Sequence, residues 1–159
     1  MELKFLDHAK SFFEQNKNKS LAAALTGTWI TSGMKGTQLK LFETTKTTQF
    51  ADFILVATVQ NPIQAGAISH QIIKTLKQFD LSVRTVEGSQ ESDWILIDMY
   101  DLVIHLFTPA AREIYALDEL LACYKSVTIP QEFYTFAADQ DWESISQSSN
   151  DTDDFKNYI

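Results

Sequence analysis

The sequence contains a single cysteine, Cys123, and this scarcity limits both its chemistry and its compartment. One thiol cannot form a disulfide within the chain, and a chain without disulfides suits a reducing compartment. No catalytic motif surrounds Cys123, so we expect it to be a packing residue of the core or of the region near the surface.

Long apolar runs are also missing. The longest ones fall well short of the ~20 residues that a membrane-crossing helix needs. Residues 1–15 include acidic side chains and no long apolar block, which is unlike a secretory signal and too acidic for a transit peptide. The sequence therefore predicts no membrane partner.

Basic charge is scarce as well. The chain has 13 Lys and Arg against 21 Asp and Glu, a net charge of −8. Six of the acidic residues and one basic residue lie in residues 139–159, so residues 1–138 carry only −3. Binding to phosphates needs clustered Lys and Arg, which argues against direct sequence-specific binding of nucleic acid. A basic protein surface is a more natural partner for such a chain.

What the chain does have is enough length, 159 residues, for one domain with a substantial core. Three- and four-residue apolar spacing predicts a helix over 2–16, and Asn61 and Pro62 form a cap-plus-proline signal that opens a second helix to about 79. Thr108 and Pro109 repeat that signal for a third helix towards 121. Five strands are predicted, at 38–45, 52–59, 82–88, 94–98 and 102–107.

The expected fold is therefore a single α/β domain, a mixed sheet flanked by helices. The continuous apolar run at 52–59 indicates a strand covered on both faces, and the last two strands should pair as a hairpin. Residues 20–37 are ambiguous: their start could be helical, and the Gly, Ser and Thr that follow favour a loop or short strand. From 122 onwards the periodicity fades, and the polar, acidic end is typical of disorder.

Three polar residues lie inside the apolar hairpin: Asp98, Asp101 and His105. Two carboxylates near one turn could hold Mg²⁺, but phosphoryl transfer also needs a Gly-rich loop or a Lys/Arg cluster, and the sequence has neither. The alternative is that Asp101 makes the turn and Asp98 is half exposed. His105 has no second His or Cys at ligand spacing, which favours hydrogen-bonded packing over zinc binding. We expect no metal and no cofactor.

Arg112 and Tyr115 lie three residues apart on the helix after the hairpin. One interpretation is that Arg112 pairs with a carboxylate such as Asp98 or Asp101 and orders the turn. The other is that Arg112 binds a partner, and the two are compatible.

Together these residues resemble the Iojap family, the ribosomal silencing factors, over about 38–121. The family pattern is Val-Glu-Gly, a spacer, Trp-x-x-x-Asp-x-x-Asp-x-x-x-His, and then Pro, Arg and Tyr. The residues that match it here are Val86, Glu87, Gly88, Trp94, Asp98, Asp101, His105, Pro109, Arg112 and Tyr115. The stretch 50–58, with Asp52, Ala57 and Thr58, resembles the family's Ala-Asp-Tyr-Phe-x-x-Ala-Thr strand.

The chain departs from the family pattern at several positions. Tyr100 stands where the family has a turn glycine, and Met99 stands beside it in place of an aromatic or Leu. The remaining departures replace a Gly, an Arg, a His and a terminal Trp, at Val59, Ile63, Thr108 and Leu121 respectively.

The resemblance implies a nucleotidyltransferase-like fold without its catalytic residues, and a homodimer that is not an enzyme. It also implies binding to the large ribosomal subunit through the ribosomal protein numbered fourteen, where it blocks joining of the small subunit and represses translation. The implied compartment is the bacterial cytoplasm or, alternatively, a mitochondrial or plastid matrix. Two other readings stay open: an assembly factor that docks at the same site, and a degenerate nucleotide binder.

The hairpin has the composition of a protein interface, with aromatic anchors, apolar neighbours and a few charges. Carboxylates there would complement a basic ribosomal protein. We divide the chain into residues 1–37, a helix plus an unassigned insertion; 38–121, the Iojap-like domain; and 122–159, an acidic extension. The predicted partner-binding residues are Trp94, Leu96, Asp98, Met99, Tyr100, Asp101, His105, Arg112 and Tyr115.

Overall fold

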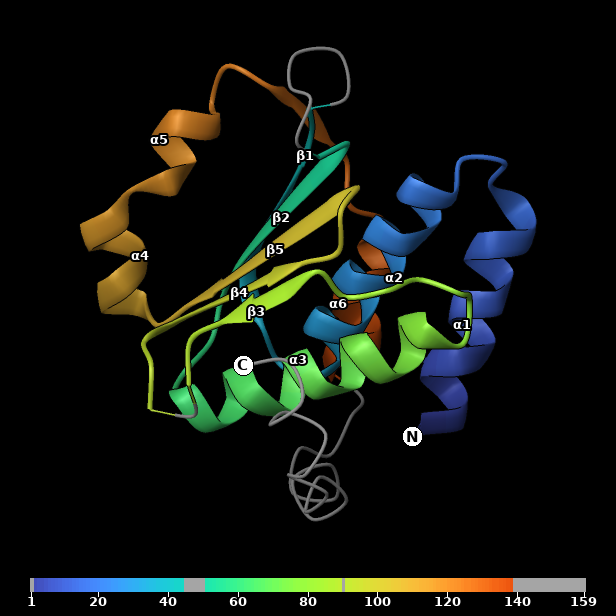
Figure 1. The fold of residues 1–159 in the computed structure, drawn as a ribbon, viewed down its shortest axis with the longest axis horizontal. Helices are drawn as coiled ribbons and strands as arrows, with labels where there is room; N and C mark the ends of the chain where they lie inside the picture. The colour runs from blue at the N-terminus through green and yellow to red at the C-terminus, as the bar shows by residue number, and fades with distance from the viewer. Residues whose placement is uncertain (1, 45–50, 90, 139–159) are drawn as a thin grey trace.

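The computed structural model describes residues 2–44, 51–89 and 91–138. Six strands form one mixed sheet in the order β3-β4-β5-β2-β1-β6, with helices on both faces, which confirms the predicted fold class (Figure 1). The strands are β1 Thr37–Glu43, β2 Phe53–Thr58, β3 Thr85–Glu87, β4 Trp94–Asp98, β5 Leu102–Phe107 and β6 Lys125–Val127. The helices are α1 Glu2–Gln15, α2 Lys19–Gly33, α3 Pro62–Lys77, α4 Pro109–Tyr115, α5 Leu117–Leu121 and α6 Gln131–Ala138.

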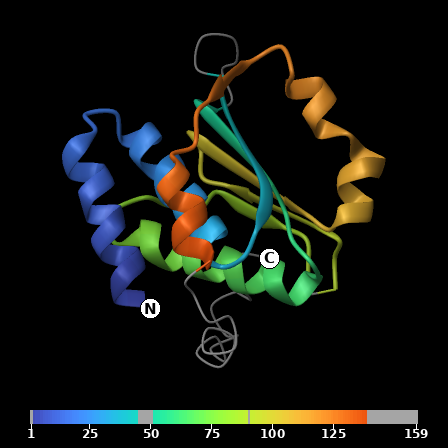
Figure 2. The same cartoon turned by 180° about the vertical axis from the view of Figure 1, so that it is seen from behind.

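The two faces of the sheet are covered unequally. Of the helices in the described residues, α1, α2, α3 and α6 lie on one side and the short α4 and α5 lie on the other (Figures 1 and 2). Strand β2 contributes to both sides, because Leu55 belongs to the main core and Val56 to a second, smaller cluster. The prediction that residues 52–59 form a strand covered on both faces is confirmed.

Helix α3 begins as its sequence predicts. The side chain of Asn61 accepts a hydrogen bond from the backbone N–H of Gln64, at 2.9 Å, and Pro62 occupies the first turn. At the other end Lys74 and Lys77 lie in the last turn, where positive charge is favourable.

Residues 20–37 are mostly helix, so the loop or short strand expected for their second part is wrong. Helix α2 runs to Gly33 and is buried over most of its length. The hydroxyls of Thr26, Thr28 and Thr31 donate to carbonyl oxygens four residues earlier, at 2.7–2.8 Å, so these polar groups are satisfied inside the helix. Burial against the sheet outweighs the low helix propensity of Gly and Thr.

The C-terminal region also departs from expectation. The single helix predicted towards 121 is divided at Ala116, whose φ of 46° is left-handed, into α4 and α5. Beyond 122, where we expected the pattern to fade, β6 pairs with β1 and α6 packs beside α2 (Figure 2). Phe133 of α6 lies 4.9 Å from the ring of Trp29 and 5.6 Å from that of Phe12. The disorder predicted for the acidic end concerns residues 139–159, which lie outside the described residues.

Cys123 is exposed just after α5, so it is not a core residue. Within the described part of the chain, no helix has the length and apolar character that crossing a bilayer requires.

Candidate functional site

Strands β4 and β5 form the predicted hairpin, and their alternation divides it into a buried side and a partly open side. Ile95 and Ile97 are fully buried towards the main core. Trp94, Leu96 and Asp98 point to the opposite side and are half-buried. The pairing register places these three beside Phe107, His105 and Val103 respectively. The structure therefore places Trp94, Leu96, Asp98 and His105 on one sheet face, as the alternation predicts.

The same face continues onto β2, because Val103 and His105 pair with Ile54 and Val56. Helices α4 and α5 cover only part of it, through a cluster of Phe42, Val56, Phe107, Ala111 and Leu121. We call the area beside this cluster the open face; it comprises the half-buried Ile54, Trp94, Leu96, Asp98 and Val103, together with the buried His105. Sequence reasoning did not name Ile54 and Val103 as site residues; the alternation of side chains along a strand places both on this face.

The open face contains a group of packed aromatic rings centred on Trp94. The ring of Trp94 lies 5.1 Å from that of Phe107 and 4.5 Å from that of Tyr115 on α4. On a third side its Nε1–H donates a hydrogen bond of 3.2 Å to Nδ1 of His105. Tyr115 is 52% exposed, so this group borders solvent at its α4 end. These contacts hold the indole of Trp94 in a defined orientation while leaving it half-buried.

His105 is 8% exposed, and its burial lowers its pKa from 6.5 to about 4, because a buried ring resists taking up a charge. A neutral ring that accepts a hydrogen bond at Nδ1 carries its proton on Nε2. Hydrogen-bonded packing, rather than metal ligation, accounts for His105 in this arrangement. Within the described residues, no three His, Cys, Asp or Glu side chains come together as a metal site.

The aspartate whose side chain makes the hairpin turn is not the one that we expected. The carboxylate of Asp98, not that of Asp101, accepts a hydrogen bond from the backbone N–H of Tyr100, at 2.9 Å. Asp101 acts through its main chain: its carbonyl oxygen accepts from the N–H groups of Asp52, at 2.8 Å, and of Phe53, at 3.0 Å. The side chain of Asp98 is half-buried on the face of Trp94 and Leu96. That of Asp101 is exposed and borders a pocket with Lys19 of α2 and Leu76 of α3.

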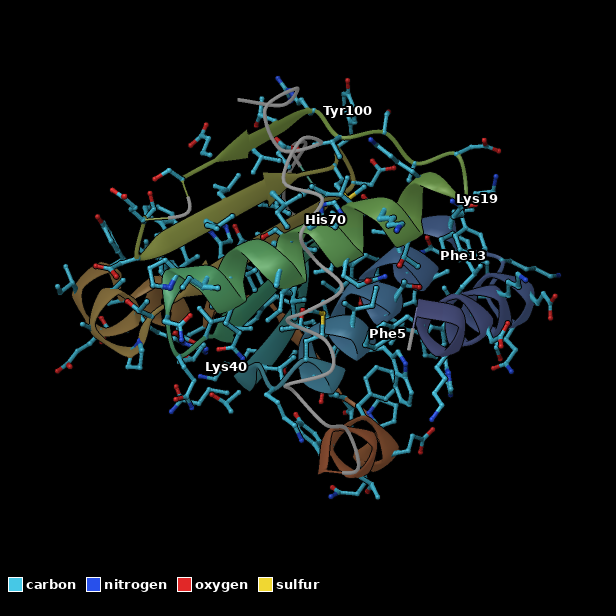
Figure 3. The ribbon with its side chains drawn as sticks, turned by 90° about the horizontal axis from the view of Figure 1, so that it is seen from below. Phe5, Phe13, Lys19, Lys40, His70 and Tyr100 are labelled. Atoms are coloured by element: carbon cyan, nitrogen blue, oxygen red, sulfur yellow. The ribbon has the colours of Figure 1, made fainter. Side chains whose placement is uncertain are left out.

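Tyr100 occupies a backbone position that favours glycine, with a φ of 65°. Its ring is 52% exposed and lies at the outer end of the hairpin, near Arg84 (Figure 3). The neighbouring Met99, by contrast, is only 4% exposed and belongs to the main core. Met99 was predicted to contact a partner, but its side chain supports the turn from inside.

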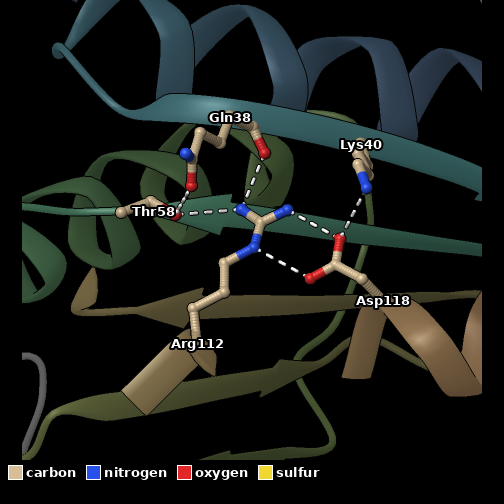
Figure 4. A network of polar contacts seen from close by, with 5 residues as sticks. All are labelled: Gln38, Lys40, Thr58, Arg112 and Asp118. Atoms are coloured by element: carbon tan, nitrogen blue, oxygen red, sulfur yellow. Dashed lines mark hydrogen bonds and ion pairs between the residues drawn. The ribbon is translucent and has the colours of Figure 1, made fainter. Parts of the chain in front are cut away.

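Arg112 does pair with a carboxylate, but neither Asp98 nor Asp101 is its partner. Arg112 pairs with Asp118 on α5, through Nε to Oδ2 at 2.9 Å and Nη2 to Oδ1 at 2.8 Å. Its Nη1 donates to the carbonyl oxygen of Gln38, at 2.7 Å, and to Oγ1 of Thr58, at 3.0 Å (Figure 4). Lys40 also reaches Oδ1 of Asp118, at 3.2 Å. We call these five residues the Arg112 network.

The Arg112 guanidinium, through these hydrogen bonds, holds the pKa of Asp118 below its usual value. Sequence reasoning missed Asp118, Gln38 and Thr58 as partners of Arg112. Asp118 is six positions after Arg112, which would place the two on different sides of a continuous helix. Only the left-handed residue at Ala116 turns α5 so that the two side chains meet.

With this geometry described, comparison with known proteins identifies the family. A family model described as "Ribosomal silencing factor during starvation" matches residues 15–156. The chain belongs to this family. Its members are named as silencing factors rather than as enzymes.

Individual relatives agree with this assignment at moderate identity. The ribosomal silencing factor RsfS of Halalkalibacterium halodurans is 33% identical over 70 residues, covering 44% of this chain and 60% of that protein. The RsfS of Haemophilus influenzae is 28% identical over 90 residues, covering 57% and 88%. A mouse protein named "Mitochondrial assembly of ribosomal large subunit protein 1" is 28% identical over 98 residues, covering 54% of this chain and 42% of its own length.

Solved structures share the fold. A Bacillus halodurans protein superposes with a TM-score of 0.57 at 24% identity, covering 70% of this chain and 99% of the other. A Chromobacterium violaceum protein superposes with a TM-score of 0.55 at 26% identity, covering 67% and 93%. About a third of this silencing-factor chain therefore has no counterpart in either structure.

Proposed function

We propose that this member of the ribosomal silencing factor family binds the large ribosomal subunit with its open face and sterically prevents the small subunit from joining. The observation that carries the proposal is the open face itself. Trp94 and Leu96 are held on a strand, only half-buried, with the carboxylate of Asp98 on the same face and the exposed Asp101 in the turn that follows. A rigid aromatic anchor with apolar neighbours is typical of the centre of a protein interface.

The partner within the subunit is proposed to be the ribosomal protein numbered fourteen, as the family resemblance implies. Charge supports this choice. The chain has a net charge of −8, and proteins that lie on ribosomal RNA are basic. Asp98 and Asp101 would steer and orient such a partner, whereas Trp94 and Leu96 would supply most of the affinity. The protein would act wherever its ribosomes are, in a bacterial cytoplasm or an organelle matrix.

The function is tested with purified ribosomal subunits. We expect the protein to co-sediment with large subunits and to reduce the yield of joined ribosomes when small subunits are added. Trp94→Ala should weaken co-sedimentation by about thirtyfold or more if Trp94 is an interface anchor. Tyr134→Ala is the matched control, because Tyr134 is a partly exposed aromatic on α6, on the opposite side of the sheet.

Thermal unfolding followed by circular dichroism separates a binding defect from a folding defect in Trp94→Ala. A variant that melts like the wild type but no longer co-sediments supports the open face as the site. A stable Trp94→Ala that still co-sediments with large subunits would argue against it. Failure of the wild type to bind large subunits would refute the function itself.

A second function is favoured by the mouse relative, whose name describes assembly of the mitochondrial large subunit. An assembly factor would use the same open face but act before the subunit is complete. The two functions differ in their substrate: an assembly factor should bind immature large subunits more tightly than mature ones, whereas a silencing factor must bind mature ones.

A further inference from the structure

Helices α4 and α5 form an arm, residues 109–121, that has few apolar contacts with the sheet. Of its residues, Ala111 and Leu121 are buried against the sheet, and Leu117 is half-buried. Ile114 on the outer side is 77% exposed. An element with so small a buried surface needs another interaction to fix its position.

The Arg112 network supplies that interaction. The Arg112 side chain is only 10% exposed, and its donors reach α5 through Asp118, β1 through Gln38 and β2 through Thr58. The fork of two parallel hydrogen bonds between a guanidinium and a carboxylate is among the strongest and most directional contacts in proteins. One side chain therefore joins the arm on both sides of its kink to two strands.

The strands are shaped to receive Arg112. The register of β1 against β2 shifts between Thr37 and Lys40, and Gln38 in this bulge has a φ of 48°. A bulge releases a carbonyl from the ladder and re-aims it, and here the carbonyl oxygen of Gln38 accepts from Arg112. Thr58 accepts from Arg112 and in turn donates to Oε1 of Gln38, at 3.0 Å. The polar atoms of this contact are thus used within the chain rather than offered to a partner.

Fixing Arg112 also fixes Tyr115. The two residues lie three apart in the seven-residue α4, so one turn of helix transmits the position of one to the other. Tyr115 is the arm's contact with the aromatic group, 4.5 Å from Trp94. The chain of contacts therefore runs from Asp118 through Arg112 and Tyr115 to Trp94 on the open face.

We propose that Arg112 and Asp118 are positioning residues for partner binding: their ion pair places Tyr115 against Trp94, and the partner engages the open face tightly only when the arm is fixed in this way. Neither residue contacts the partner. This role rests on the proposed function, because the open face must be the docking site for its alignment to matter. It replaces the direct partner contact predicted for Arg112.

Asp118→Asn tests the role, because it removes the charge and half of the fork with little change in volume. Glu43→Gln is the matched control: it removes one carboxylate charge from the surface ion pair with Lys125, 3.1 Å long and on the other side of β1. Two measurements are made on each full-length variant: affinity for purified large subunits, and the indole N–H signal of Trp94 in a ¹⁵N nuclear magnetic resonance spectrum. The chain has three tryptophans, and Trp94→Phe identifies the relevant signal by its loss.

We expect Asp118→Asn to shift or broaden the Trp94 signal and to weaken binding by about twofold to thirtyfold, the range in which residues outside a site typically act. Glu43→Gln should change neither. Arg112→Lys, which keeps the charge but loses the fork, should give a smaller effect of the same kind and provides a second variant if Asp118→Asn unfolds.

Two results would overturn the positioning role. One is wild-type affinity in Asp118→Asn and Arg112→Lys despite a changed Trp94 signal. The other is weaker binding with an unchanged Trp94 signal, which would mean that Asp118 contacts the partner or acts by another route. Failure of the wild type to bind large subunits refutes the proposed function instead. In that case an unchanged Trp94 signal in Asp118→Asn would still refute the claim that the ion pair of Arg112 and Asp118 positions Tyr115 against Trp94.

Discussion

Acidification should destabilise this protein through His105 in particular, because its ring is buried in the aromatic group with Nδ1 already accepting from the indole of Trp94. A second ring proton would have to sit on Nδ1, where it would meet the N–H of Trp94. Burial lowers the pKa of His105 from 6.5 to about 4 in the folded chain. The unfolded chain, with its ordinary pKa, therefore takes up the proton first as pH falls.

The sign and size of the effect follow from these two values. The stability associated with neutral His105 is complete above pH 6.5, falls as pH drops, and is fully lost below about pH 4. The whole loss corresponds to about 3 kcal/mol in the free energy of unfolding, of which about 2 kcal/mol is lost by pH 5. Because His105 is only 8% exposed, solvent screens this effect little.

Urea unfolding at pH 8 and pH 5, followed by circular dichroism, measures the effect. His105→Asn is the control, since its side-chain oxygen can accept from Trp94 but does not titrate. Contributions from all other groups are common to both proteins and cancel in the difference. From pH 8 to pH 5 we expect the free energy of unfolding of the wild type to fall by about 2 kcal/mol more than that of His105→Asn. A constant gap would refute the burial of a neutral His105.

Three further outcomes are expected. Gly88→Ala should cost about 2 kcal/mol or more in the free energy of unfolding, because Gly88 has a φ of 104° and a Cβ there would collide with the carbonyl oxygen of Trp94; a urea titration measures it. Tyr100→Gly should keep or raise the melting temperature by relieving a positive φ, while weakening binding to large subunits if the exposed ring is a contact. Light scattering at micromolar concentration should give twice the 18.1 kDa chain mass, and a single chain mass would refute the predicted homodimer.

Much of the fold was predictable because its signals are local. Asn61 and Pro62 mark the start of α3 by capping chemistry alone, and the continuous apolar run at 52–59 identifies a central strand. The alternation of residues 94–98 placed Trp94, Leu96 and Asp98 together without any knowledge of the tertiary structure. The open face is therefore largely visible in the sequence.

The misses have a different origin, since they depend on contacts between distant parts of the chain. The second half of helix α2, residues 26–33, consists mostly of weak helix formers, and its burial against the sheet explains why it is helical. A Cβ on Gly27 would lie 3.2 Å from Ile104 of β5. The partner of Arg112 depended on one left-handed residue, Ala116, that no sequence signal marks. Alanine has no preference for the left-handed conformation, so the kink between α4 and α5 follows from packing and cannot be predicted from the sequence.

The unequal covering of the sheet explains how one hairpin can support both folding and recognition. In β4, Ile95 and Ile97 face the side with four helices and are fully buried. The residues that alternate with them, Trp94, Leu96 and Asp98, face the side with the small arm and stay half-buried. Loss of an isoleucine side chain would leave a cavity in the core, while loss of Leu96 would mainly change the surface offered to a partner. Because the period of a strand is two residues, the two sets of side chains are fixed by one backbone. The main core thus holds the open face rigid, so that a partner does not have to order it on binding.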